Sequence, residues 1–356
     1  MNKTKRTGAV ALALVMVLAL VPMVTPNAQA ATVVINLAGL EAALNSGGEA
    51  VLSANISGTT QLSVKNNSTI DLNGHNLIVK ASNATNAIVI EPGITLTIKD
   101  SKYTGNKIDN GRLEAWGRVG IHNTSATLII DSGFVTATGN SFGAAIGGDQ
   151  RTSTIDGGTV IINGGTVTAT ANGLGAAIGG GRGQVHPNPG GNGGNVRITG
   201  GTVKATGGSS GYDIGSGRSN NSNGGTLEVT GGTLEFANSG TNASPLSFKN
   251  CTIKGKGAEG FSGKYNAQGK RNLAEFSNTK KTAGQGKTLK LTVKGESIKA
   301  VKWTTSKKAN VKITKGANKK TVTLKGVKKG KKSTIKAVVT YKDGSKKTLK
   351  RIVTVK

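Results

Sequence analysis

Cysteine, proline and aromatic residues are all scarce in this chain of 356 residues. Its one cysteine, Cys251, cannot form a disulfide within the chain, so packing and hydrogen bonds must hold the fold, and Cys251 is expected to be a small buried apolar residue. Proline is limited to 6 residues while glycine reaches 54, which excludes collagen and favours many tight turns. Aromatic residues make up 3%, so any core must consist of Val, Ile, Leu and Ala, which suit thin, regular layers.

Long apolar runs are missing after the first 30 residues. Those residues have the order of a secretory signal: a basic start (3–6), an apolar stretch (9–21) and Ala28-Gln29-Ala30, whose small residues fit a cleavage site. We therefore expect a signal peptide at 1–30 and a mature chain from Ala31 that is secreted or located at the extracellular cell surface, with no transmembrane segment. An uncleaved membrane anchor is the alternative.

Acidic residues are nearly absent from the last part of the chain. Residues 280–356 hold 25 Lys and Arg against 2 acids, Glu296 and Asp343, whereas residues 31–279 hold 18 basic and 15 acidic residues. This charge step predicts a domain boundary near residue 280. The local net charge of +23, out of +29 for the chain, exceeds what solubility requires, so we expect an anionic cell-wall polymer or polysaccharide as partner. A solvated face that protects sheet edges is the alternative, and the scarcity of Arg and aromatics predicts no specific nucleic-acid binding.

Internal repetition is what the sequence has in abundance. Four segments align with one another at similar but unequal spacings: LIIDSGFVTATG (128–139), VIINGGTVTATA (160–171), VRITGGTVKATG (196–207) and LEVTGGTLEFAN (227–238). A second element, GAAIGG at 143–148 and 175–180 and YDIGSG at 212–217, recurs with the same spacing as the first three segments and is expected at a corner of each coil. Two elements that repeat in register predict a solenoid, in which each coil pairs with its neighbours above and below.

Apolar residues inside each repeat recur at every second position, which is the period of a β-strand. Stacking the repeats predicts inward columns such as Leu128/Val160/Val196/Leu227, Val135/Val167/Val203/Leu234 and Ala137/Ala169/Ala205/Phe236. A polar column, Asp131/Asn163/Thr199/Thr230, is interpreted as structural. Less regular coils come before, at 68–82 and 94–105, and the helical spacing at 35–46 predicts a helix that caps the N-terminal end.

The segment IDLNGHNLIV (70–79), the DSG or NGG corners before TVTA, and the GAAIGG repeats resemble the pectate-lyase-like right-handed β-helix proteins. Within that group, they resemble more closely the Gly-rich β-helix surface proteins of Gram-positive bacteria. The resemblance covers roughly residues 48–255 and implies a three-sheet right-handed parallel β-helix. It implies no activity, because this fold hosts lyases, hydrolases, adhesins and spacers alike.

Residues 280–356 contain short alternating segments separated by turn signals, which predict about seven strands and an Ig-like sandwich. VKWTTSKKANVKI (301–313) and KKGKKSTIKAVVTYKDG (328–344) resemble the bacterial Ig-like domains of group 2, a family of stalk and adhesion modules. The resemblance implies that Trp303 lies in the core; an exposed, sugar-stacking Trp303 is the alternative. The predicted organisation is therefore all-β: a right-handed parallel β-helix with a capping helix at 31–255, a linker at 256–279 and a basic Ig-like sandwich at 280–356.

One group of residues could support catalysis. Asp131, Asp149 and Asp156 could bind Ca²⁺ near Arg151 as base, as a β-helix lyase requires. However, Asp131 belongs to the polar column, and the corresponding loop of the next coil, GRGQVHPNPGGNGGN (181–195), has no acid. We therefore interpret Asp149, Arg151 and Asp156 as solvated loop residues.

No catalytic, cofactor-binding or metal-binding residue is predicted elsewhere. His75, His122 and His186 lack the spacing of metal ligands, and no Gly-Lys-Ser/Thr follows the Gly-rich segments, so they are not phosphate loops. The favoured hypothesis is a non-catalytic surface protein whose solenoid presents a glycan- or matrix-binding surface at the loops 148–159 and 179–195, while the basic domain tethers it to anionic wall polymers. A polysaccharide lyase or glycoside hydrolase and an inert structural spacer are the alternatives.

Overall fold

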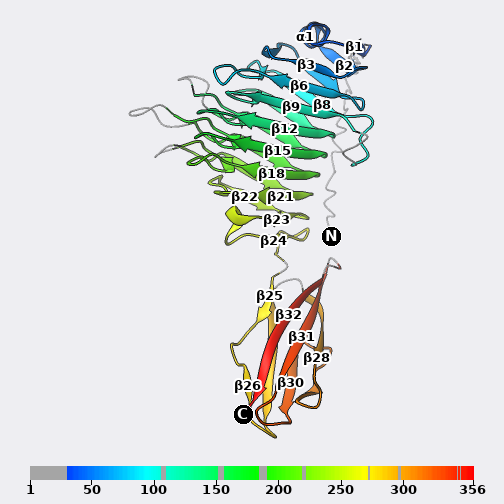
Figure 1. The fold of residues 1–356 in the computed structure, drawn as a ribbon, viewed down its shortest axis with the longest axis vertical. Coiled ribbons are helices and arrows are strands. Elements are labelled where there is room, and N and C mark those ends of the chain that lie inside the picture. The colour runs from blue at the N-terminus through cyan, green and yellow to red at the C-terminus, as the bar shows by residue number, and fades with distance from the viewer. Residues whose placement is uncertain are drawn as a thin grey trace, which may run out of the picture.

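The computed structural model shows two β-rich bodies that follow each other along the chain (Figure 1). The first is a parallel β-solenoid, and the second consists of two four-stranded sheets. The predicted signal peptide apart from Ala30, together with Arg151 and His186, lies outside the described residues. The structure describes residues 30–105, 110–150, 156–183, 191–218, 222–271, 273–295, 298–342, 344 and 346–356.

Three sheets of parallel strands form the walls of the solenoid, and between residues 48 and 236 the chain passes through them in the same order. The first sheet contains β1 (Thr32–Val34), β2 (Gly48–Leu52), β5 (Ser68–Asp71), β8 (Thr95–Lys99), β11 (Thr127–Ile130), β14 (Thr159–Ile162), β17 (Asn195–Ile198), β20 (Thr226–Val229) and β22 (Leu246–Phe248). The second contains β3 (Ile56–Gly58), β6 (Asn76–Lys80), β9 (Arg112–Gly117), β12 (Phe134–Gly139), β15 (Thr166–Ala171), β18 (Thr202–Thr206), β21 (Thr233–Phe236), β23 (Thr252–Lys254) and β24 (Gly263–Lys264). The third contains β4 (Leu62–Val64), β7 (Ile88–Ile90), β10 (Ile121–His122), β13 (Ile146–Gly147), β16 (Ile178–Gly179) and β19 (Ile214–Gly215).

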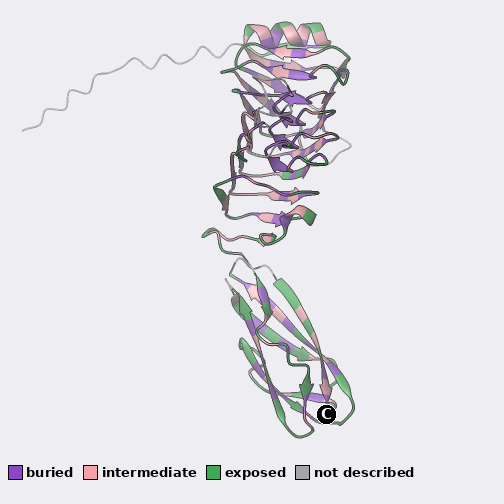
Figure 2. Cartoon of the chain, turned by 90° about the vertical axis from the view of Figure 1, so that its left-hand side faces the viewer, coloured by how far each residue is buried: buried purple, intermediate pink, exposed green. Residues whose placement is uncertain are grey.

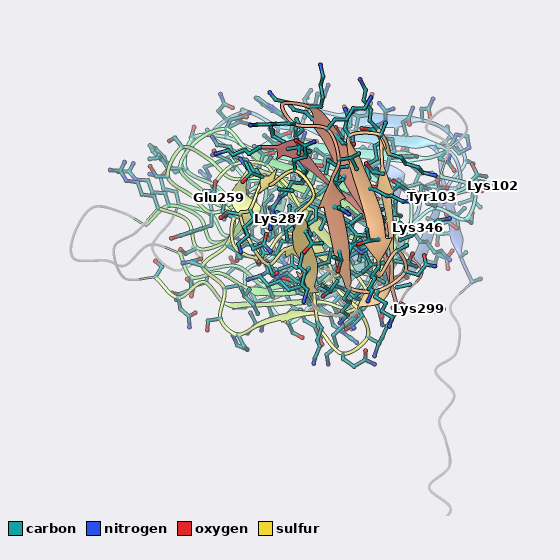
Figure 3. All side chains as sticks on the ribbon, turned by 90° about the horizontal axis from the view of Figure 1, so that it is seen from below. Lys102, Tyr103, Glu259, Lys287, Lys299 and Lys346 are labelled. Carbon is teal, nitrogen blue, oxygen red and sulfur yellow. The ribbon has the colours of Figure 1, made fainter. Side chains whose placement is uncertain are left out.

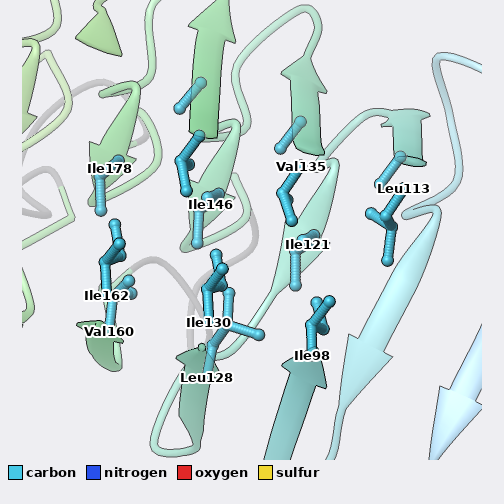
Figure 4. Close-up of a cluster of buried hydrophobic side chains, with 14 of the residues drawn as sticks. Ile98, Leu113, Ile121, Leu128, Ile130, Val135, Ile146, Val160, Ile162 and Ile178 are labelled. Atoms are coloured by element: carbon cyan, nitrogen blue, oxygen red, sulfur yellow. The ribbon is translucent and has the colours of Figure 1, made fainter. Parts of the chain in front are cut away.

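The register confirms the parallel solenoid and its repeats. Leu128 pairs with Val160, Val160 with Val196 and Val196 with Leu227, as the sequence alignment predicts. The column that begins at Val135 is paired in the same way. These side chains are almost entirely buried. Figure 4 shows part of this apolar core, in which Leu128 and Val160 come from neighbouring coils. A single coil could not bury such a face, so each coil depends on its neighbours.

Three consecutive coils share a frame of constant length. From the start of the first-sheet strand to the end of the third-sheet strand, the coils span 127–147, 159–179 and 195–215, so all three frames are equally long. The frames nevertheless start at unequal intervals along the chain, because the second follows the first more closely than the third follows the second. The whole difference therefore falls in the segment that returns from the third sheet to the first, where the inter-coil loops lie.

The third sheet corrects the sequence interpretation of GAAIGG as a coil corner. Its Ile-Gly pairs form short strands instead, in which Ile146, Ile178 and Ile214 point inward. The glycines after them, Gly147 and Gly179, have φ of +138° and +137°, which residues with a side chain rarely adopt. A Cβ on either would overlap the carbonyl oxygen of the next glycine in the stack, so the motif is required by close coil-to-coil approach.

A helix and an antiparallel strand close the two ends of the solenoid. The segment with helical spacing forms α1 (Leu37–Ser46); the Asn36 side chain accepts a hydrogen bond from the Gly39 amide (2.8 Å), and Leu40 and Leu44 are buried on the first coil. At the other end, a short helix, η1 (Lys256–Ala258), precedes β24, which pairs antiparallel with β23. Phe236, Phe248, Phe261 and Tyr265 pack together there, with ring centroids 5.1–5.8 Å apart.

Cys251 is buried in this C-terminal end of the solenoid core, as expected. Burial raises the pKa of its thiol to about 11, because the apolar surroundings disfavour the thiolate. The residue is therefore an unreactive part of the core at neutral pH.

The second body packs two sheets around an apolar core. One has the order β25-β27-β30-β29 and the other β26-β32-β31-β28, with β26 parallel and all other pairs antiparallel. Trp303 is buried between them and donates its indole N–H to the Lys319 carbonyl (2.7 Å), which confirms the core position and excludes the sugar-stacking one. The strands are β25 (Ala274–Phe276), β26 (Thr282–Ala283), β27 (Thr288–Gly295), β28 (Ile298–Thr305), β29 (Val311–Lys315), β30 (Thr321–Gly326), β31 (Lys332–Tyr341) and β32 (Lys346–Val355).

The segment 256–279, predicted as a linker, contains elements of both bodies. η1 and β24 complete the end of the solenoid, and β25 pairs with β27 of the second body.

Candidate functional site

The acids that the sequence grouped as possible catalytic residues take part in structural contacts. Asp131 lies at the exposed corner between β11 and β12, where its carboxylate accepts a hydrogen bond from the Asn163 amide (2.8 Å). The Thr199 hydroxyl in turn donates to the amide oxygen of Asn163 (2.8 Å). The predicted polar column is therefore a hydrogen-bonded ladder that links three successive coils.

Asp149 is buried, with 3% of its surface exposed, so its interpretation as a solvated residue is wrong. Its carboxylate forms an ion pair with Arg118 (2.5 Å) and accepts hydrogen bonds from the side chain of Asn86 (3.2 Å) and the amide of Gln150 (2.6 Å). Arg118 also donates to the carbonyl of Ala84 (2.8 Å). This network ties three coils together and occupies the carboxylate that a metal would need.

Asp156 connects its loop to the next coil. Its carboxylate accepts hydrogen bonds from the backbone amide (2.7 Å) and the side-chain amide (3.3 Å) of Asn192. His122 is buried on β10 and His75 follows the corner after β5. Among the described residues, no group of three or more His, Cys, Asp or Glu could hold a metal ion.

A further buried acid, Asp213, was not singled out by the sequence analysis. It occupies the place that Ala145 and Ala177 take in the preceding coils, and it is completely buried. Its carboxylate accepts hydrogen bonds from the backbone amides of Gly207 (2.6 Å), Asn238 (2.9 Å) and Gly240 (2.9 Å). The only sequence signal is the change from GAAIGG to YDIGSG, and the role is to hold the loops of the last coils.

Charged residues on the outer faces of the solenoid are largely paired with opposite charges. Lys254 forms a hydrogen bond with Glu235 and lowers the pKa of that carboxyl, and Glu49 raises the pKa of Lys99 in the same way. The outer faces are therefore close to electrically neutral. The ion pairs are Lys80–Glu114 (3.7 Å), Arg112–Glu114 (3.3 Å), Lys99–Glu49 (2.9 Å), Lys99–Asp71 (3.9 Å), Arg197–Glu228 (3.3 Å), Lys204–Glu235 (4.0 Å) and Lys254–Glu235 (2.9 Å).

Trp116 is a candidate binding residue that the sequence analysis also missed. It lies on β9 between the buried Ala115 and Gly117, so its partly exposed indole points outward from the second sheet. Its neighbours in the outward column are Lys80 and Thr138. The sequence could have indicated this, because Trp116 falls on the outward-facing positions when inward and outward residues alternate along the strand. An indole on a flat face with polar neighbours can stack on a sugar ring.

The second body presents many lysines and very few acids. Its strands alternate buried and exposed residues, and Figure 2 shows the exposed positions along both sheets. In the view along the long axis, Lys287, Lys299 and Lys346 point outward at separate places around the body (Figure 3). Among the residues described in this body, Lys294–Glu275 (3.1 Å) is the one ion pair. The positive charge is therefore largely uncompensated on both outer faces.

Comparisons with known proteins give little beyond this geometry. No family model and no curated protein matches the chain. Among solved structures, domains 4 and 5 of the S-layer protein SbsC are similar at 19% identity and a TM-score of 0.20. The match covers 29% of this chain and about half of that one (55%), and so low a TM-score supports no statement about fold or function. Within the described part of the chain, no helix has the length and hydrophobicity to cross a membrane.

Proposed function

We propose that this is a secreted or cell-surface protein without catalytic activity, whose basic body binds anionic cell-wall polymers or acidic glycans. The observation that carries the proposal is the unbalanced charge: 25 Lys and Arg against 2 acids in residues 280–356, with a single ion pair among the described residues of the body. Charge that served solubility alone would be smaller and mixed in sign, as it is on the solenoid. A polyanion that bound this surface would exchange its condensed cations for lysine side chains, and the release of those cations into solution would favour binding.

The solenoid presents its side face and inter-coil loops to glycan or matrix ligands in this proposal. Two features support that role: the outward indole of Trp116 and, among the three coils with frames of equal length, the confinement of length variation to the loops after the third sheet. We assign the solenoid to the right-handed β-helices of the pectate-lyase type, because connections between parallel strands are nearly always right-handed. We assign the second body to the bacterial Ig-like sandwiches. The involvement of Asp131, Asp149 and Asp156 in structural contacts gives no support to a lyase.

Retention of the mature chain on purified Gram-positive cell walls tests the proposal. With about four lysine contacts, binding should weaken on the order of a hundredfold between about 50 and 200 mM NaCl. Walls stripped of their anionic polymers should retain little protein. Retention that does not change with salt would refute the proposal. Release of unsaturated uronides from acidic polysaccharides in the presence of Ca²⁺ would replace it with a lyase.

A further inference from the structure

A groove of about 510 Å³ lies on the second body at strands β31 and β32 and the residue before β26. Three lysines line it from separate segments: Lys281 before β26, Lys332 at the start of β31 and Lys350 on β32. None of the described residues that line the groove is acidic. Three cations around one depression give a stronger local positive potential than the same number of lysines spread over a flat face.

Arg351 holds one side of this groove in place. Its guanidinium donates to the backbone carbonyl and the side-chain oxygen (3.2 Å) of Asn278 and lies 4.3 Å from the centroid of the Phe276 ring. Burial lowers the pKa of Arg351. The segment it fixes leads directly to Lys281, whose carbonyl accepts the amide of Thr354 (2.9 Å). Arg351 therefore positions Lys281 and is itself not free for a ligand.

The outer face around the groove alternates cationic and uncharged rows. Lys336 lies opposite Lys350 across the β31–β32 pair, Thr334 lies opposite Ile352, and Lys332 lies in the row beyond. Lysines in one strand four residues apart are separated by about 13 Å. Two like charges directly opposite each other destabilise a sheet, so an anion bound between Lys336 and Lys350 would relieve the repulsion between the two ammonium groups.

Ile352 lies between the two cationic rows with 57% of its surface exposed, although it belongs to a strand with a well-packed inner face. An exposed isoleucine surrounded by lysines gives the groove an apolar floor. A bound molecule that used both features would carry anionic groups joined by units that present C–H groups.

We propose that this groove is the principal binding site of the body and that its ligand is an anionic polymer of sugar or polyol units. In this assignment Lys281 and Lys332 contact one anionic group, Lys350 with Lys336 contacts the next, and Ile352 packs against the C–H face between them. The inference rests on the proposed function and adds the location and the chemistry of the site. Nucleic acid fits less well, because the described lining of the groove offers no aromatic ring for base stacking. A membrane would require a larger apolar patch than one isoleucine.

The test compares two variants of the full mature chain that each lose three charges. The groove variant is Lys281→Gln/Lys332→Gln/Lys350→Gln. The matched control, Lys290→Gln/Lys312→Gln/Lys325→Gln, changes exposed lysines of the opposite sheet, including Lys312 and Lys325, which also lie opposite each other. Binding to immobilised polygalacturonate and to a glycerol-phosphate polymer is measured over a range of salt. The groove variant should reduce the slope of log K against log salt by about 2, whereas the control should change it by less than about 0.5.

A third variant, Ile352→Thr, tests the apolar contact and keeps a β-branched residue on the strand. Loss of that contact should weaken binding to both polymers about three- to tenfold at all salt concentrations, with an unchanged slope. Binding to inorganic polyphosphate, which has no C–H groups, should not change. Comparison of polygalacturonate with the glycerol-phosphate polymer shows whether carboxylates or phosphodiesters are the natural anions.

If the groove and control variants lost equal amounts of polymer affinity and of salt dependence, the groove assignment would be overturned, while general polyanion binding by the body would stand. Stronger binding to single-stranded DNA or to anionic lipid vesicles than to both polymers, abolished by the groove variant, would overturn the ligand class. Thermal unfolding curves of the three variants that match the unmodified chain establish that each is folded.

Discussion

Replacing Gly179 by alanine should break the solenoid between two coils. Gly179 has φ of +137°, and an added Cβ would overlap the carbonyl oxygen of Gly215 in the next coil. That oxygen accepts the amide hydrogen of Gly180 (2.9 Å). The methyl group can be accommodated only if the two coils separate at the third sheet, where Ile178 stacks on Ile214.

The expected cost has two parts. A side chain in this backbone region costs about 1–3 kcal/mol. Leaving the Gly180–Gly215 hydrogen bond unmade in a buried position costs about 1–3 kcal/mol more. The sum, about 2–6 kcal/mol, is a large fraction of the unfolding free energy of an ordinary domain, about 5–15 kcal/mol. Because the coils are coupled only to their neighbours, we expect the coils after residue 195 to unfold separately from those before it.

Two controls separate strain from overlap. Gly93→Ala adds a methyl group at φ of +80° with no atom within 4 Å, so it should cost about 1 kcal/mol through strain alone. Gly173 lies outside the positive-φ region, but its Cβ would overlap the Ser141 carbonyl, so Gly173→Ala reports overlap alone. Urea unfolding followed by circular dichroism measures all three variants. A Gly179→Ala free energy of unfolding within about 0.5 kcal/mol of that of Gly93→Ala, with no added transition, would refute this account of the glycine stack.

Two further predictions concern buried groups of the solenoid. Arg118→Met should destabilise the solenoid by about 3–5 kcal/mol, because it leaves the Asp149 carboxylate charged and buried without its partner. The double variant Arg118→Met/Asp149→Leu should recover most of this free energy. A cost below about 1 kcal/mol for the single variant, measured by urea unfolding, would contradict the role of the pair. For Cys251, whose pKa rises to about 11 in the folded state, the native state retains the proton that the unfolded state loses above about pH 9, so stability should fall as pH rises from about 9 to 11. The difference in unfolding free energy between the unmodified chain and Cys251→Ala should change by about 2–3 kcal/mol across that range; a constant difference would show that the thiol does not titrate as its burial requires.

Most of the solenoid core could be predicted from the sequence because two periods act together. The two-residue period assigns Leu128 and Ile130 to the inside of a strand, and the shared spacing of two separate elements fixes the register of one coil on the next. The polar ladder of Asp131 and Asn163 followed from the same alignment.

The contacts that the alignment missed are those that break the repeat. Asp213 replaces an alanine, and its partners come from residues 207, 238 and 240, so only the folded chain reveals why a carboxylate is tolerated there. Asp149 pairs with Arg118, which belongs to the preceding coil, and no local pattern indicates this pairing. Ile352 follows the outward phase of its strand, but the groove around it depends on how Arg351 fixes the segment before β26.

The constant length of the coil frames also has a consequence for how such a chain can change. The strands of successive coils pair in the same register, so a coil inserted or removed between two equivalent points leaves the strands on either side correctly paired. Unequal recombination between repeats of the gene would therefore lengthen or shorten the solenoid by whole coils without disturbing its core. Each such event would duplicate or delete one return loop together with its coil, so the number of loops and the height of the stack would evolve in step.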